Sequence, residues 1–177
     1  MDISGGPVDV AAIETARLRV RDAIVETPCA YSQTLSELTN ARCFVKLENL
    51  QMTGSFKERG AANLLLQLGP EVRRSGVIAA SAGNHGLAVA FHAQRLGIPA
   101  TIVMPEYAPL IKVTSARRYG AEVILHGSNY DDAYERARAL GDERGAVFVH
   151  PFDDARVIAG QGTVSYTHLT LPTIYSV

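Results

Sequence analysis

The chain has 177 residues, 47% of them hydrophobic and 20% charged, which is typical of a folded globular protein. This composition excludes a disordered chain, a collagen-like repeat and a disulfide-stapled miniprotein. The formal net charge is −1, so no basic excess favours nucleic acid or an anionic membrane. We therefore expect no nucleic acid and no membrane among the partners.

The first residues carry no early Lys or Arg and no apolar core, unlike a signal peptide. Cys29 and Cys43 lie far apart and form no C-x-x-C pair, which favours buried thiols in a reduced compartment over a disulfide. The uncharged run 75–94 has polar residues at its centre, which indicates a strand, a loop and a helix rather than a membrane span. We expect a cytoplasmic protein.

The first sixty residues predict two helices and a strand. Apolar residues at helical spacing from 13 to 24, behind an N-cap at Asp9, indicate a helix that ends at Thr27-Pro28. Residues 32–39 indicate a short second helix. Alternating apolar residues at 43, 45 and 47 indicate a strand.

From about residue 60 to 150 strands and helices alternate regularly, which predicts an α/β fold: a doubly wound parallel sheet with helices on both faces. The predicted strands carry continuous apolar runs, as expected where both sheet faces are buried. Glycine follows each helix as a C-terminal cap. Strands are expected at 77–80, 100–104, 121–125 and 146–149, and helices at about 87–96, 110–119 and 130–140, ending near Gly97, Gly120 and Gly141.

Lys57 lies where a strand and a polar loop open a further helix. Ser55 and Glu58 have the spacing of a capping box, which places Phe56 and Lys57 in the first helical turn. The positive end of the helix dipole lowers the pKa of a lysine there and raises its free-amine fraction, as a Schiff-base lysine requires. The alternative interpretation is that Lys57 is a solvated surface lysine.

A second polar segment, Ser81-Ala82-Gly83-Asn84-His85-Gly86, follows a predicted parallel strand and opens a helix. Open α/β sheets bind ligands at this edge, and helix-start N–H groups favour an anion. Gly83 and Gly86 allow the backbone to approach a ligand closely. A helix cap with a tight turn is the alternative.

A third segment runs from His150-Pro151-Phe152-Asp153-Asp154 to Gly160-Gln161-Gly162-Thr163. Alone it is weak evidence, because the aspartates can cap a helix and the glycines can serve close packing.

The chain has no G-x-G-x-x-G fingerprint, phosphate-loop motif, H-E-x-x-H or G-x-S-x-G. Its five histidines lack metal-ligand spacing, so no metal site is predicted.

In this order, the three segments resemble the fold-type-II pyridoxal-phosphate enzymes (tryptophan synthase β-like), most closely the threonine dehydratases, or threonine ammonia-lyases. The resemblance covers residues from about 10 to 164. It implies pyridoxal 5'-phosphate as cofactor and Lys57 as the lysine that binds it covalently and later removes the substrate Cα proton. Phe56 would pack near the cofactor, and Asn84 would hydrogen-bond its 3′-oxygen. Ser81, Ala82, Gly83, Asn84 and His85 would form the loop that holds the substrate carboxylate.

The reaction implied is conversion of L-threonine to 2-oxobutanoate and ammonia, from which isoleucine synthesis starts. Family racemases resemble Ser-Ser-Gly-Asn-His at the carboxylate loop, whereas this chain has Ala82, which favours dehydration. Alternatives in the family are a serine or 3-hydroxyaspartate dehydratase, a β-replacement enzyme or a serine racemase. Outside it, a small-anion-binding α/β module remains open. The resemblance also implies a small amino-acid substrate and a homo-oligomeric parent enzyme.

Family members continue through a glycine-rich phosphate loop that this sequence lacks. We therefore expect an N-terminal fragment that binds the cofactor poorly and is nearly inactive. Residues 165–177 show no helical period and are expected to be a non-native ending. The expected division is 1–60 in a larger domain, 61–150 as a smaller α/β domain, 151–164 as the return to the truncated larger domain, and 165–177 as the tail.

Overall fold

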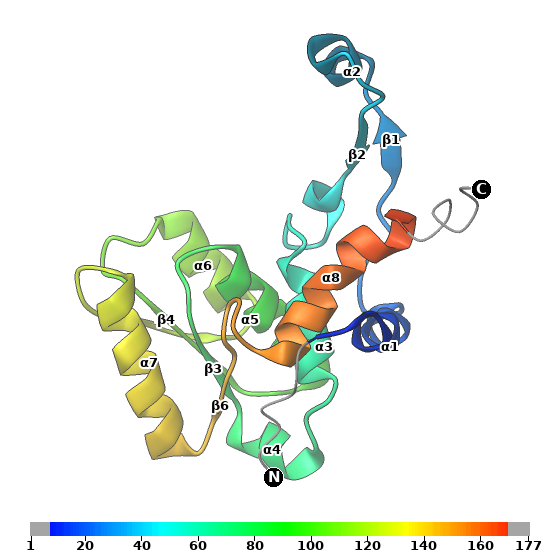
Figure 1. The fold of residues 1–177 in the computed structure, drawn as a ribbon. Coiled ribbons are helices and arrows are strands. Elements are labelled where there is room, and N and C mark those ends of the chain that lie inside the picture. The colour runs from blue at the N-terminus through cyan, green and yellow to red at the C-terminus, as the bar shows by residue number, and fades with distance from the viewer. Residues whose placement is uncertain (1–7, 170–177) are drawn as a thin grey trace.

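The computed structural model describes residues 8–169, which form an α/β unit and a second group of elements beside it (Figure 1). The helices are α1 (Val10–Val20), α2 (Gln33–Thr39), α3 (Lys57–Leu65), α4 (Pro70–Ser75), α5 (Asn84–Leu96), α6 (Leu110–Arg118), α7 (Tyr130–Arg144) and α8 (Ala155–Leu169), with a 3-10 turn, η1, at Glu48–Leu50. The strands are β1 (Cys29–Tyr31), β2 (Phe44–Lys46), β3 (Val77–Ala80), β4 (Ala100–Met104), β5 (Glu122–Leu125) and β6 (Val147–Phe148).

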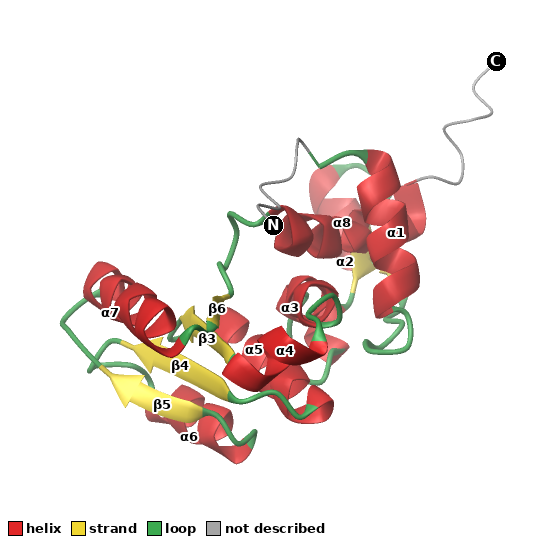
Figure 2. Ribbon diagram, turned by 90° about the horizontal axis from the view of Figure 1, so that it is seen from below, coloured by secondary structure: helices red, strands yellow, loops and turns green. Residues whose placement is uncertain are grey.

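The α/β unit is built on a parallel four-stranded sheet in the order β5-β4-β3-β6. Figure 2 shows α7 on one face of this sheet, with α5 and α6 on the other. The chain proceeds outward from β3 through β4 to β5, and α7 then returns it to β6 on the opposite side of β3. The direction of winding therefore reverses between β3 and β6, and open α/β sheets bind ligands at the carboxyl ends of the strands at such a point.

Alternate residues of β3 serve different cores, because successive strand side chains point to opposite faces. Val77 and Ala79 pack with the helices on the α5 face, whereas Ile78 and Ala80 pack with α7. All four residues of β3 are buried. The predicted doubly wound α/β fold is thereby confirmed.

The second group contains α1, α8 and the antiparallel pair β1–β2, whose end carries α2 and projects from the rest (Figure 1). Helix α3 packs against both α5 and α8 and so joins the two groups. A Cβ at Gly160 would lie 2.5 Å from the Arg59 carbonyl oxygen and 2.7 Å from the Gly60 Cα. Backbone contact thus fixes the crossing of α3 and α8.

Several boundaries differ from the sequence prediction. Helix α1 has its N-cap at Asp9, as predicted, but ends at Val20 rather than at Thr27-Pro28. Helix α7 does not end at Gly141, which lies inside it against Ile78; its cap is Gly145, at φ 63°. Strand β1 and helix α4 are elements that the sequence reading did not predict.

The predicted tail begins inside α8, which continues to Leu169 despite the missing helical period. Residues 170–177 lie outside the described residues. The predicted boundary between residues 60 and 61 falls within α3, and the division into domains stays a prediction.

Three further observations concern residues 8–169. Cys29 and Cys43 are free thiols, each half-buried rather than buried. No helix in this range combines the length and apolar character that a bilayer span requires. Within the same range, no group of three or more His, Cys, Asp or Glu side chains is arranged to hold a metal ion.

Candidate active site

Lys57 is the first residue of α3, and its side chain is half-buried. Its Nζ donates a hydrogen bond of 2.9 Å to the carbonyl oxygen of Pro151 and lies 5.5 Å from the centroid of the Phe56 ring. Burial lowers the pKa of the Lys57 ammonium below its ordinary value. The predicted helix-start position and the lowered pKa are both present, although burial is the cause of the shift.

The predicted capping box does not form. The Ser55 hydroxyl accepts from the Lys57 backbone N–H at 3.3 Å, but the Glu58 carboxylate bonds to the Thr53 backbone N–H instead of reaching Ser55. Glu58 is fully buried, and burial raises its pKa. Its Oε2 lies 3.7 Å from Nε2 of His92 on α5. This buried contact between α3 and α5 had no signal in the local sequence pattern.

The segment Ser81–Gly83 connects β3 to α5 at the carboxyl edge of the sheet. Ser81 is nearly buried, and its Oγ accepts from the Gly83 N–H at 3.1 Å, which still leaves the hydroxyl proton to donate. A Cβ at Gly86 would lie 2.8 Å from the Ser81 carbonyl oxygen and 3.0 Å from Ile102 Cγ2. Glycine is therefore required where the first turn of α5 folds back against this loop.

His85 is buried and connects this loop to the end of β6. Its Nε2 lies 2.9 Å from the Val149 carbonyl oxygen, so Nε2 carries the proton, because a carbonyl only accepts. Burial, with the nearby positive charge of Lys57 adding to it, lowers the pKa of His85 to about 4. Its buried Nδ1 has no hydrogen-bond partner among the described residues.

Asn84 is exposed at the first position of α5, and its Oδ1 accepts from Lys112 Nζ at 2.8 Å. Lys112 is on α6, which follows the neighbouring strand β4, and the sequence reading missed it. The order of the elements could have indicated the contact of Lys112 with Asn84, because α5 and α6 both start at the carboxyl edge of the sheet. With Oδ1 held by a cation, the Asn84 amide N–H groups remain as donors.

The segment Val149–Pro151 contacts two of the predicted residues, Lys57 and His85. It leaves β6 beside β3, accepts from His85 at Val149 and accepts from Lys57 at Pro151. Lys57, from α3, therefore reaches the point where the winding of the sheet reverses. By contrast, a cavity of about 120 Å³ is lined by Arg17, Lys46 and Arg59 and by no predicted site residue.

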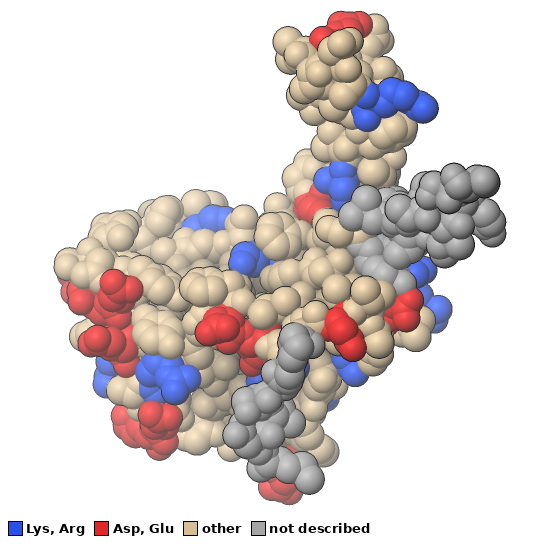
Figure 3. Space-filling view, viewed as in Figure 1, with Lys and Arg blue, Asp and Glu red and all other residues tan. Residues whose placement is uncertain are grey.

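The chemical types of these groups fit a pyridoxal-phosphate cofactor. Lys57 supplies a primary amine of lowered pKa, and the Phe56 ring, 41% exposed beside it, supplies an apolar surface. Asn84 supplies an amide donor, and the start of α5 supplies backbone N–H groups for an anion. Figure 3 shows acidic and basic side chains interspersed over one face of the molecule. At the Lys57 amine itself, burial is what lowers the pKa.

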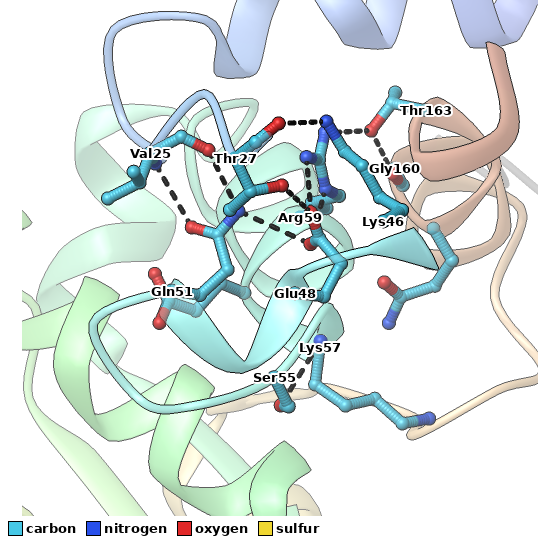
Figure 4. Close-up of polar contacts among 12 residues, drawn as sticks. Val25, Thr27, Lys46, Glu48, Gln51, Ser55, Lys57, Arg59, Gly160 and Thr163 are labelled. Atoms are coloured by element: carbon cyan, nitrogen blue, oxygen red, sulfur yellow. Dashed lines mark hydrogen bonds and ion pairs between the residues drawn. The ribbon is translucent and has the colours of Figure 1, made fainter. Parts of the chain in front are cut away.

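Behind Lys57, a buried ion pair joins Glu48 of η1 to Arg59 of α3 (Figure 4). Its two partners are 11 residues apart, and further members of the network come from still more distant segments. No local spacing rule reports such contacts, so the sequence reading missed this network.

Known proteins resemble this chain in sequence and in structure. L-threonine ammonia-lyase of Thermotoga maritima is 55% identical over 152 residues, which cover 86% of this chain and 38% of that relative. The processed form of threonine deaminase isoform 2 from Solanum lycopersicum is similar in structure, with 37% identity and a TM-score of 0.81 over 93% of this chain and 47% of that one. Maize serine racemase has 36% identity and a TM-score of 0.86, over 90% of this chain and 48% of that one.

The chain thus spans less than half of the length of each of these relatives. Along the chain itself, the sequence profile of the pyridoxal-phosphate dependent enzymes matches residues 20–169. That range contains Lys57, the loop after β3 and the segment after β6. The chain therefore belongs to the family of pyridoxal-phosphate dependent enzymes.

Proposed function

We propose that the whole protein deaminates L-threonine to 2-oxobutanoate and ammonia with pyridoxal 5'-phosphate as cofactor. The observation that carries the proposal is the convergence of Lys57 and the Ser81–His85 loop on the segment after β6. The identity of 55% with a threonine ammonia-lyase supports the choice of substrate. We further propose a cytoplasmic, homo-oligomeric enzyme whose product can supply isoleucine synthesis.

In this proposal Lys57 would hold the cofactor, and its Nζ would take the proton from the substrate Cα. The cofactor, when bound, withdraws the electron pair that this leaves on Cα. Burial favours the free amine that accepts the proton, because desolvation disfavours the ammonium. The Cα proton and the Cβ hydroxyl leave as one molecule of water, and one molecule of water is consumed when the dehydrated product is hydrolysed to the 2-oxo acid. The net change is therefore the release of ammonia.

The Ser81–His85 loop would bind the substrate carboxylate through the Ser81 hydroxyl and the N–H groups at the start of α5. Neutral His85 would hold the loop against Val149 rather than contribute a charge. Asn84 would donate from its amide to the cofactor 3′-oxygen. Phe56 would pack beside the ring.

Ala82 favours elimination over racemisation, because it offers no exchangeable proton on the side opposite Lys57. The likeness to maize serine racemase makes racemisation the alternative to test. Serine and 3-hydroxyaspartate dehydration remain rivals, since a single methyl group gives only modest discrimination in a pocket. An anion-binding module without catalysis is the rival outside enzymes.

The test is steady-state turnover by the whole protein on L-threonine, L-serine and 3-hydroxyaspartate, followed by formation of the 2-oxo acid. We expect the highest kcat/KM for L-threonine and no D-serine from L-serine. The matched variant Ala82→Ser should gain D-serine formation. Higher kcat/KM for another substrate would replace threonine in the proposal, and absence of any 2-oxo acid would remove the enzymatic function.

A further inference from the structure

A buried charge network lies beside the start of α3 (Figure 4). The Arg59 guanidinium, 3% exposed, contacts Glu48 through two bonds of 2.8 Å, one to each carboxylate oxygen. The same carboxylate accepts from the Thr27 hydroxyl at 2.6 Å and from Gln51 Nε2 at 3.2 Å. Four hydrogen bonds thus satisfy a buried carboxylate that would otherwise be costly.

The network joins segments that are far apart in the sequence. Gln51 bonds to both backbone groups of Val25, accepting from its N–H at 3.0 Å and donating to its carbonyl at 2.9 Å. Arg59 also donates from Nη1 to the Thr163 hydroxyl of α8 at 3.2 Å. The chain before β1, the turn η1, α3 and α8 are therefore fixed to one another.

Residues 52–56 and Lys57 lie between two members of this network, Gln51 and Arg59. Met52 is 61% exposed and Phe56 41%, so little apolar packing holds the loop itself. Figure 4 shows the Lys57 side chain extending away from the network, and its Nζ reaches Pro151. The network therefore restrains the residues on both sides of Lys57, in addition to the Thr53–Glu58 bond and the packing of α3 against α5 and α8.

We propose that the Glu48–Arg59 pair, with Thr27 and Gln51, is a positioning device that holds the Lys57 amine at the Pro151 carbonyl. The role rests on the proposed function of Lys57 as the cofactor lysine. A buried ion pair adds little net stability compared with an apolar replacement, whereas its directional bonds fix geometry. Arg suits this task because its planar fork matches a carboxylate.

Stability and positioning make different predictions for the Lys57 amine. If the network positions it, loosening the network admits water, and the pKa of Lys57 rises toward its ordinary value. Substitution of Glu48 or Arg59 would also remove a charge of the network, and a change of charge shifts pKa values by itself. Variants that change no charge, Thr27→Val and Gln51→Met, therefore separate the two effects.

The experiment is a titration of the chain labelled with ¹³C at the lysine Cε, followed by NMR without cofactor. The chain has three lysines, Lys46, Lys57 and Lys112, so the signals can be assigned by single Lys→Arg variants. We expect the Lys57 midpoint to move upward in Thr27→Val and further in Gln51→Met. The control Val77→Ala, a core change at the opposite end of β3 from the site loop, should lower Tm without moving that midpoint.

The proposal is overturned if both network variants lose stability like Val77→Ala while the Lys57 midpoint stays at the wild-type value. If Gln51→Met does not fold, Thr27→Val decides alone, because it removes one hydroxyl and keeps the side-chain shape. The titration uses no cofactor. A failure of Lys57 to bind pyridoxal phosphate would therefore refute the proposed function without changing this result.

Discussion

The Ser81–His85 loop extends from a strand whose four residues are all buried, whereas Lys57 begins a helix that is held by directional polar bonds as well as by packing against α5 and α8. On the first side, packing and sheet register set the position of the loop, and many small contacts each contribute a little. On the second side, a few buried hydrogen bonds add to the packing of α3, and each can be broken alone. We therefore expect single substitutions on the two sides to change the free energy of unfolding by different amounts.

The largest expected effect comes from breaking the polar side. Arg59→Met leaves the Glu48 carboxylate buried without its partner and should lower the free energy of unfolding by about 3–5 kcal/mol. The matched variant Arg144→Met breaks a pair with Glu122 whose side chains are 40% and 50% exposed, and should cost at most about 1 kcal/mol. Urea unfolding measures both, and equal losses would contradict the contrast.

A fall in pH should weaken the contacts of α5 with α3 and with the segment after β6, where His92 and His85 are buried. His85 and His92 have pKa values lowered to about 4 by burial, whereas an unfolded histidine titrates near 6.5. As the pH falls from 6.5 to 4, the unfolded state binds more protons, so stability is lost, on the order of 3 kcal/mol per histidine.

Glu58, whose pKa is raised by burial, acts in the opposite direction, so the raw slope mixes both effects. The informative quantity is the difference between the wild type and His92→Gln in urea unfolding across this pH range. The variant should lose less stability on acidification. Parallel curves for the two proteins would show that His92 does not bear the expected linkage.

A smaller effect is expected from crowding the packed side. Gly86→Ala places a methyl group 2.8 Å from the Ser81 carbonyl and should cost about 1–3 kcal/mol. Gly83→Ala, in the same loop at φ −132° and with its nearest atom at 4.0 Å, should cost less than about 1 kcal/mol. If the two variants have the same Tm, close packing does not hold the loop.

The same contrast explains what the sequence could predict. The bounds of β3 and β4 were predicted from their apolar runs, and Gly97 is the left-handed cap expected for α5, at φ 65°. These signals lie within a few residues. The Thr27–Glu48 and Arg59–Thr163 bonds join residues 21 and 104 apart, so no local pattern reveals them.

Local rules also failed where burial outweighed them. Ser55 and Glu58 have capping-box spacing, but the buried Glu58 carboxylate bonds to Thr53 instead. Gly141 sits inside α7 because its missing side chain allows the helix to approach Ile78. The roles assigned to Lys57 and to the Ser81–His85 loop came from resemblance, and they stay predictions.

Covalent trapping determines whether Lys57 binds the cofactor. Pyridoxal phosphate in excess is added, the adduct is reduced with borohydride, and the peptides are mapped by mass spectrometry. We expect the adduct on Lys57 and its loss in Lys57→Ala. An adduct confined to Lys46 or Lys112, and unchanged in Lys57→Ala, would contradict it.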